Sequence, residues 1–263
     1  MISFRHALLA STVFASLSAS TALAQSPTQL TATPASPAPA ASDPNIDRGF
    51  ILPTAMTQPK GTVTYNNYEL LLHGVTYGVT DNVQSSLTVV SPIVRGMPFF
   101  GLASTKARFS PASRAHLALQ GTLGFMHVLN DGESGTLYSL GAGAYASFCL
   151  RSDCSSLVSG SVSYSYLTTG GPDTGYLLVY GGSVVHAVSD RVKLLAEVTS
   201  AGGGQNAAGD LKTVDGFLLS YGLRFHGTTF ASDVGFMKPF DTSGGTGDFL
   251  LGLPFVSVSY RWE

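Results

Sequence analysis

Apolar and polar residues alternate along the chain from residue 61 to its end. A period of two places successive side chains on opposite faces of a β-strand. The alternation is clearest in residues 155–167, where an apolar face opposes a row of serines: Val158, Val162, Tyr164 and Tyr166 against Ser159, Ser161, Ser163 and Ser165. The pattern therefore predicts an all-β protein whose strands have one apolar face and one hydrated face.

Turn-forming residues divide this region into twelve predicted strands. These strands cover residues 62–66, 68–79, 83–91, 100–109, 115–125, 136–149, 155–167, 176–188, 192–201, 216–226, 229–238 and 249–262. Short links, such as 81–82, alternate with longer Gly-rich links, such as 202–215. Up-and-down outer-membrane barrels alternate short periplasmic turns with longer external loops, and an even strand number returns both termini to the periplasm. The tight link near Asn66 and Asn67 is the exception.

A soluble β-sandwich would show the same alternation, so the composition of the polar face is needed to distinguish the two folds. That face is dominated by Ser, Thr, Gly and Gln, whereas an exposed sandwich surface carries more Lys and Glu. Only 11% of the residues are charged, which is sparse for a water-soluble surface. Aromatic residues near strand ends, among them Tyr77, Phe148 and Trp262, suit the girdles of a membrane barrel. We therefore expect an antiparallel up-and-down transmembrane β-barrel of about 12 strands.

The N-terminal part of the chain has a different composition. Residues 1–24 combine Arg5, an apolar run and small residues before Gln25, as in a secretory signal peptide. Residues 25–50 are rich in Pro, Ala and Ser and are predicted to be a disordered periplasmic linker. Residues 51–263 are then one barrel domain. No later stretch offers the length of uninterrupted apolar sequence that a membrane-spanning helix needs.

Charge and cysteine content narrow the possible partners. Removing the leader, which carries Arg5, leaves 13 Lys and Arg against 16 Asp and Glu, a net charge of about −3 that argues against a nucleic-acid partner. Cys149 and Cys154 are the only cysteines, and an exported chain meets an oxidising compartment. We expect a disulfide between them; the alternative is two free thiols, since so small a loop adds modest stability. No further ligands lie nearby in the sequence, so no metal site is predicted.

The alternation also directs a set of polar side chains into the lumen, and these are the candidate pore-lining residues: Lys106, Arg108, His116, Gln120, Lys193, Glu197, Arg224 and Asp233. With Arg261, five cations face two carboxylates, and rings of fixed charge bias ion flow. One hypothesis is a small passive channel or porin-like transporter for small polar solutes. The alternative is a cross-strand ion network that fills a narrow barrel and leaves an occluded structural or surface-interaction protein.

Two parts of the chain resemble a known class of proteins. The segments Pro53-Thr54-Ala55, Pro59-Lys60-Gly61 and Tyr77-Gly78-Val79-Thr80-Asp81-Asn82 resemble the start of uncharacterised outer-membrane β-barrels of Gram-negative bacteria. The last strand resembles the terminal strand read by the barrel-insertion machinery, although Glu263 follows the usual final aromatic residue. The resemblance implies a place in the outer membrane, contact with its lipid and lipopolysaccharide, and insertion by that machinery. It implies no activity.

Catalytic motifs are weak in this chain. Serine is so frequent that a coincidence of Ser and His indicates nothing, and neither a Gly-x-Ser-x-Gly elbow nor a His-Glu-x-x-His helix occurs. The run from Gly141 to Ala146 has the letters of a dinucleotide fingerprint, but it lies in a strand-period segment without a following helix. We therefore expect neither an enzyme nor a bound cofactor.

Overall fold

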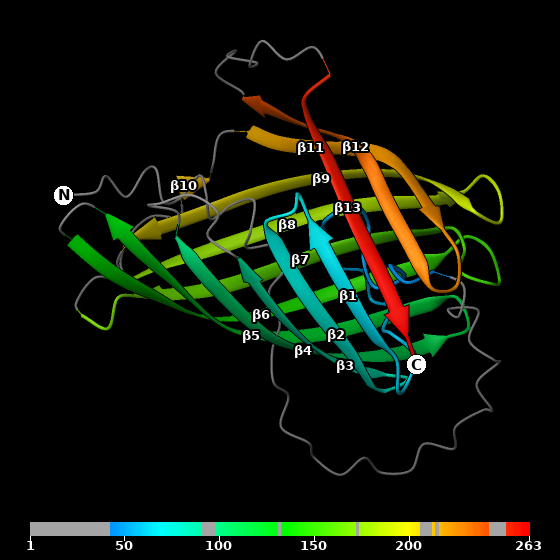
Figure 1. The fold of residues 1–263 in the computed structure, drawn as a ribbon, viewed down its shortest axis with the longest axis horizontal. Coiled ribbons are helices and arrows are strands. Elements are labelled where there is room, and N and C mark those ends of the chain that lie inside the picture. Colours follow the sequence, from blue (N-terminus) through cyan, green and yellow to red (C-terminus); the bar gives the residue numbers. More distant parts are fainter. Residues whose placement is uncertain are drawn as a thin grey trace.

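The computed structural model describes residues 43–90, 98–130, 133–171, 174–205, 212–213, 216–241 and 251–263. These segments contain the strands β1 (Val63–Tyr68), β2 (Leu72–Thr80), β3 (Val83–Val90), β4 (Phe99–Ala112), β5 (Ala115–Asn130), β6 (Glu133–Cys149), β7 (Leu157–Thr168), β8 (Thr174–Ala187), β9 (Val192–Gln205), β10 (Lys212–Thr213), β11 (Gly216–His226), β12 (Phe230–Asp241) and β13 (Leu253–Trp262). Each strand pairs antiparallel with its neighbours, and β13 pairs with β1 (Figure 1). The short β10 is attached to the edge of β9.

The predicted fold is confirmed, because β1–β9 and β11–β13 form a closed twelve-stranded antiparallel barrel. The two faces of the strands are exposed and buried as the alternation predicts. On β7, Val162 and Tyr164 point outward and are 44% and 47% exposed, whereas Ser159 and Ser165 point inward and are 5% and 7% exposed. The soluble sandwich is thereby excluded. Within the described residues, no helix is long and apolar enough to cross a membrane.

Some predicted strand boundaries are wrong. Asn66 and Asn67 lie inside β1, and the first link follows at residues 69–71, where Glu69 and Leu70 adopt the left-handed backbone with φ of 52° and 61°. The β5–β6 ladder also continues to the pair formed by Asn130 and Glu133, beyond the predicted ends at 125 and 136. Residues there satisfy their backbone groups by strand pairing, although they no longer show the apolar alternation.

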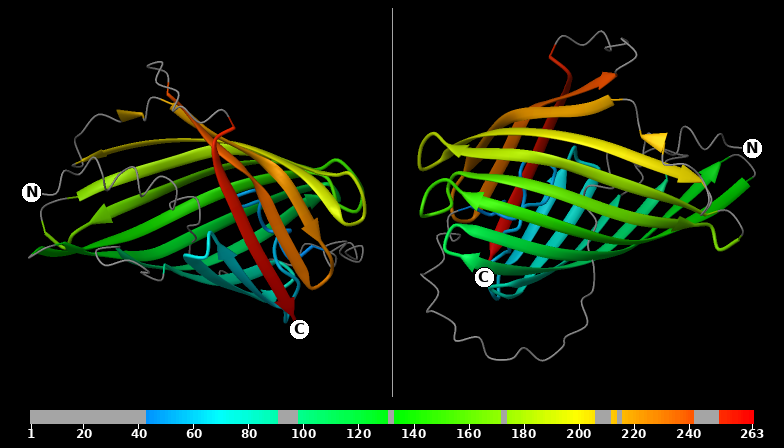
Figure 2. Two further views of the ribbon diagram at one scale, coloured as in Figure 1. Left: turned by 45° about the horizontal axis from the view of Figure 1, so that its top comes forward. Right: turned by 180° about the vertical axis from the view of Figure 1, so that it is seen from behind.

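The barrel wall is uneven in height. β5 and β6 have 16 and 17 residues, whereas β1 and β2 have 6 and 9. Figure 2 shows the long strands of β4–β9 extending well beyond the short strands of β1–β3. We call the end of the barrel where β1 begins and β13 ends the terminal end, and the opposite one the far end. The height difference lies at the far end.

Residues 43–59 lie inside the barrel, and we call this segment the plug (blue in Figure 2). Asn45, Phe50 and Ala55 have no exposed surface. The prediction of a disordered linker over residues 25–50 is therefore wrong for residues 43–50, because Ile46 and Phe50 supply apolar surface that the lumen buries. Residues 25–42 and the predicted signal peptide, residues 1–24, lie outside the described residues.

Candidate functional site

The plug enters and leaves the lumen at the terminal end of the barrel. Arg261, near the end of β13, donates from Nη2 to the carbonyl oxygen of Asp43 at 2.6 Å and to Oε1 of Gln58 at 2.8 Å. Thr57 donates to the carbonyl oxygen of Asp81, in the turn between β2 and β3, at 2.7 Å. Both ends of the plug are therefore held at the same mouth of the barrel.

Between these ends the plug folds back on itself in a tight hairpin. The amide of Gly49 donates to the carbonyl oxygen of Leu52 at 2.8 Å. At this tip a single carboxylate oxygen of Glu197, in β9, accepts the amides of Phe50, Ile51 and Leu52 at 3.1, 3.1 and 2.8 Å. A buried carboxylate is stabilised when several backbone N–H groups converge on it. Glu197 thus fixes the tip of the plug partway along β9.

The wall around Phe50 is shaped for its ring. Phe50 packs against Phe255 of β13, with ring centroids 4.7 Å apart. Gly222 and Gly235 face each other on β11 and β12. A Cβ atom at either position would lie 3.0 or 2.9 Å from the Phe50 ring, closer than side chains normally pack. A Cβ atom would lie still closer to the facing backbone, so glycine at both positions permits the close approach of β11 and β12 as well as the placement of Phe50.

A cluster of buried charges joins the plug to β9, β11 and β12. Arg224 donates to both carboxylate oxygens of Asp233, at 2.7 and 3.0 Å, and its Nη1 lies 3.3 Å from Oδ2 of Asp43. Nζ of Lys193 lies 2.5 Å from the same Asp43 oxygen, and Nη2 of Arg48 lies 3.5 Å from Asp233. Burying charges in this way is costly unless they are paired and hydrogen-bonded. The plug and the wall therefore depend on each other for charge neutrality.

Wall cations also bind the backbone of the plug. Nη1 of Arg224 donates to the carbonyl oxygen of Asn45 at 2.8 Å, and Nη2 donates to that of Gly49 at 2.5 Å. Lys106, on β4, donates to the carbonyl oxygens of Asp47 and Thr54 at 3.2 and 3.0 Å. These carbonyl oxygens take the place that water would hold in an open lumen.

The side of the plug that faces β3–β6 makes fewer charged contacts. The Gln84 side chain accepts the amide of Gln58 at 2.8 Å and donates to the Asp47 carboxylate at 2.9 Å. Ser147 accepts the amide of Ala55 at 2.9 Å. A polar cavity of about 50 Å³ lies on this side, with Asp47, Gln84 and Lys106 in its lining. Such a space can hold water.

The structure brings most of the predicted pore-lining residues together around the plug. Seven of the eight are at most 8% exposed: Lys106, His116, Gln120, Lys193, Glu197, Arg224 and Asp233. Arg108 lies nearer the terminal end, where it is partly exposed and donates to Asn82 Oδ1 at 3.0 Å. These side chains face inward, and five of them contact the plug: Lys106, Lys193, Glu197, Arg224 and Asp233.

His116 belongs to a separate group beside the disulfide. Cys149 and Cys154 are bonded to each other, and Nε2 of His116 lies 3.8 Å from Cys154 Sγ. Ser110 Oγ lies 2.8 Å from the other ring nitrogen. Two sulfurs and an imidazole nitrogen within 4.8 Å have the donor types of a metal site. Cysteine binds metal strongly only as a thiolate, and both sulfurs are in the disulfide. This group therefore has a structural role.

Sequence reasoning missed the partners of these wall residues, which lie on the plug: Asp43, Asn45, Asp47, Arg48 and Gln58. A signal was present in the sequence. The run Ile46-Asp47-Arg48-Gly49-Phe50-Ile51-Leu52 combines large apolar and charged residues, unlike the Pro, Ala and Ser that precede it. Such a change in composition marks the start of a segment able to pack.

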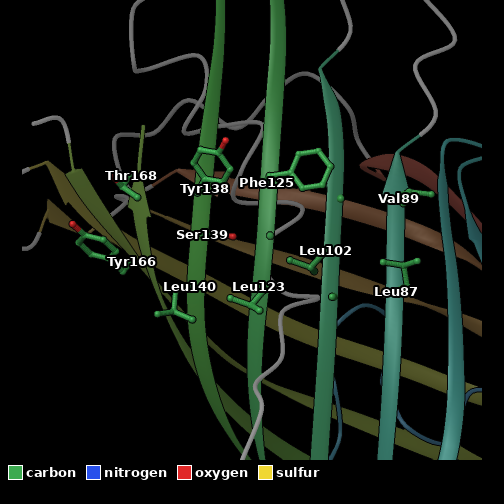
Figure 3. Close-up of a pocket in the computed structure, with 13 residues that line it drawn as sticks. Leu87, Val89, Leu102, Leu123, Phe125, Tyr138, Ser139, Leu140, Tyr166 and Thr168 are labelled. Carbon is green, nitrogen blue, oxygen red and sulfur yellow. The ribbon is translucent and has the colours of Figure 1, made fainter. Parts of the chain in front are cut away.

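The outer face has a different kind of hollow, of about 470 Å³, over β3–β7 (Figure 3). Ala103 is a small residue in its lining, and the Phe125 ring lies over Gly101. Figure 3 shows Leu87, Leu123 and Leu140 around the hollow. The side chains that line this hollow are mainly apolar.

No protein-family model and no curated protein matches the chain. Solved structures with some likeness to this chain include outer-membrane β-barrels. OmpT of Vibrio cholerae is 12% identical, with a TM-score of 0.40, over 73% of this chain and 64% of that chain. A NanC porin is 9% identical, with a TM-score of 0.43, over 76% of this chain and 97% of that chain. At such values neither likeness indicates what this barrel transports or binds.

Proposed function

We propose that the protein is an outer-membrane channel that its own plug closes at rest. A membrane location is supported by the outward-facing side chains, because Leu119, Leu123 and Leu140 are 55%, 55% and 59% exposed in a continuous apolar wall. A closed barrel also leaves no unpaired sheet edge in contact with lipid. The terminal end would face the periplasm, where up-and-down barrels with an even strand number keep both termini.

The observation that carries the proposal is the way the plug fills the lumen. An ungated passive pore would need a continuous path, and the plug occupies the space around Arg224 and Glu197. Its two ends lie at the same mouth, so the hairpin can withdraw toward the periplasm without threading through the barrel. Water can hydrate the wall groups that it leaves behind, since many of them are charged or hydroxylic. These features suit a gate better than a permanent core.

The membrane partners follow from this location. We propose that the apolar wall contacts outer-membrane lipid and lipopolysaccharide, and that the barrel-insertion machinery inserts the chain. Small polar solutes are the proposed cargo, because the lumen presents charged and hydroxyl groups. The proposal includes no catalytic activity and no cofactor.

A cross-link between plug and wall tests the gate directly. A Cβ atom at Gly49 would lie 2.8 Å from that of Ser183 on β8, so Gly49→Cys combined with Ser183→Cys can form a disulfide after a small shift. In planar lipid bilayers we expect the refolded wild-type chain to show intermittent current steps. The oxidised double variant should show none, and dithiothreitol should restore them.

The two single variants and the reduced wild type control for effects on the native Cys149–Cys154 pair. Steady current that is equal in the wild type and in the oxidised double variant would show that the plug is not a gate. A correctly inserted barrel that is silent in every variant, including one with a weakened plug, would identify an occluded structural barrel instead.

A further inference from the structure

We infer that the opened lumen binds small carboxylate anions at the pair of cations that Asp43 occupies in the closed state. This inference rests on the proposed function. Nζ of Lys193 lies 2.5 Å from Oδ2 of Asp43, and Nη1 of Arg224 lies 3.3 Å from the same oxygen. Asp43 belongs to the plug, whereas both cations belong to the wall. Withdrawal of the plug therefore removes the Asp43 carboxylate, and the two cations remain on the wall as an empty site.

The barrel itself places the two cations side by side. Lys193 and Arg224 are direct cross-strand neighbours on β9 and β11. Arg224 is also held by its two hydrogen bonds to Asp233, on the next strand. These contacts join wall to wall and do not need the plug. The Arg224 side chain is thus preorganised for a carboxylate, with Lys193 beside it on the adjacent strand, which lowers the entropic cost of binding.

The charge of the wall favours anions along the passage as a whole. Among the strand residues whose side chains the structure describes, the inward-facing charged ones are five cations and two carboxylates: Lys106, Arg108, Lys193, Arg224 and Arg261, against Glu197 and Asp233. The plug adds Asp43, Asp47 and Arg48, which partly offset this excess. Opening therefore leaves a more positive lumen, and a charged passage with low-dielectric walls concentrates counter-ions.

The closed state also indicates which anion fits. Both cations converge on a single oxygen of Asp43, Oδ2, while Oδ1 accepts the amide of Asn45. The group that the two wall cations hold in the closed state is therefore one carboxylate oxygen, while the plug itself binds the other. A free carboxylate of similar size would compete with Asp43, and its binding would favour the open state. Small carboxylates thus act as both cargo and opener.

Bilayer recordings on the full-length chain test this with acetate as the probe. In a gradient of KCl we expect chloride to permeate about ten times more readily than potassium. Replacing chloride with acetate at equal ionic strength should raise the open fraction. Lys193→Gln should weaken the acetate effect about tenfold, as expected for loss of a charge-assisted hydrogen bond. Lys60→Gln is the matched control, because Lys60 is an exposed lysine outside the lumen.

The outcomes separate this inference from the proposed function. Currents that stop on cross-linking Gly49 to Ser183 but show no anion preference, or no acetate effect, would overturn the inference and leave the gate intact. An equal acetate response in Lys193→Gln would likewise overturn the assigned site. A response to phosphate but not to acetate would reject carboxylates as the ligand class. Absence of current in every variant would reject the channel itself.

Discussion

The two sides of the plug are held by different chemistry. Toward β9 and β11–β13, the plug meets buried ion pairs and the Glu197 carboxylate, with Arg224 and Asp233 fully buried. Toward β3–β6, it meets mainly neutral hydrogen-bonding groups of Gln84 and Ser147, beside a polar cavity of about 50 Å³. Lys106 is the charged exception there, and it binds carbonyl oxygens. The plug is thus held by charge on one side and mainly by neutral hydrogen bonds on the other.

This asymmetry indicates where the plug would detach first. Replacing a neutral hydrogen bond with one to water costs about 1 kcal/mol. Separating a buried ion pair so that one charge remains dry costs about 3–5 kcal/mol. Water can enter the cavity on the neutral side before the charged side opens. We therefore expect release to begin next to β3–β6 and to be limited by the charged cluster.

The largest effect is expected at Arg224. Arg224→Met would leave the carboxylates of Asp43 and Asp233 without their shared cation and should lower the free energy of unfolding by about 3–5 kcal/mol. Urea unfolding followed by the fluorescence of Trp262, the only tryptophan, measures this loss. Arg108→Met is the matched control at a partly exposed position and should cost under about 1 kcal/mol. Equal losses in the two variants would contradict a charge-fixed plug.

The barrel could be predicted from the sequence because its signal is local. Strand period, turn residues and link lengths are all read within a few positions, and they identify the twelve strands and the inward face of residues such as Lys193 and Glu197. What those residues contact could not be read. Asp43 and Arg261 meet across a separation of 218 positions, and no local pattern encodes that contact. The sequence therefore predicts a charged lumen but not the segment that fills it.

The misplaced first link has a different cause. Asn66 and Asn67 have strong turn propensity, which favours a link between them. In the structure Asn66 instead accepts a hydrogen bond from Ser259 Oγ on β13, at 2.8 Å. Asn67 lies in the strand but stabilises the turn that follows, because its Oδ1 accepts a hydrogen bond from the amide of Leu70 at 3.1 Å. Tertiary pairing thus overrides the local preference of one asparagine and shifts the role of the other.

An intermediate effect is expected at the tip of the plug. Glu197→Gln keeps an oxygen for the amides of Phe50 and Leu52 but loses the charge, so it should weaken the tip by about 1–3 kcal/mol. Faster hydrogen exchange at amides 50–52 would report this weakening. Glu69→Gln is the matched control, because Glu69 is an exposed carboxylate that accepts one amide, that of Val256. Unchanged exchange at the tip in Glu197→Gln would show that the carboxylate does not hold it.

The smallest effect is expected on the neutral side, at Gln84. Gln84→Leu has a similar volume but removes the acceptor for the Gln58 amide and the donor to Asp47. Water from the adjacent cavity can replace both hydrogen bonds, so the free energy of unfolding should fall by about 1 kcal/mol or less. The open fraction in bilayer recordings should nevertheless rise, since this side is expected to detach first. A loss of stability as large as that of Glu197→Gln would mean that both sides hold the plug equally, and release would then have no preferred starting point.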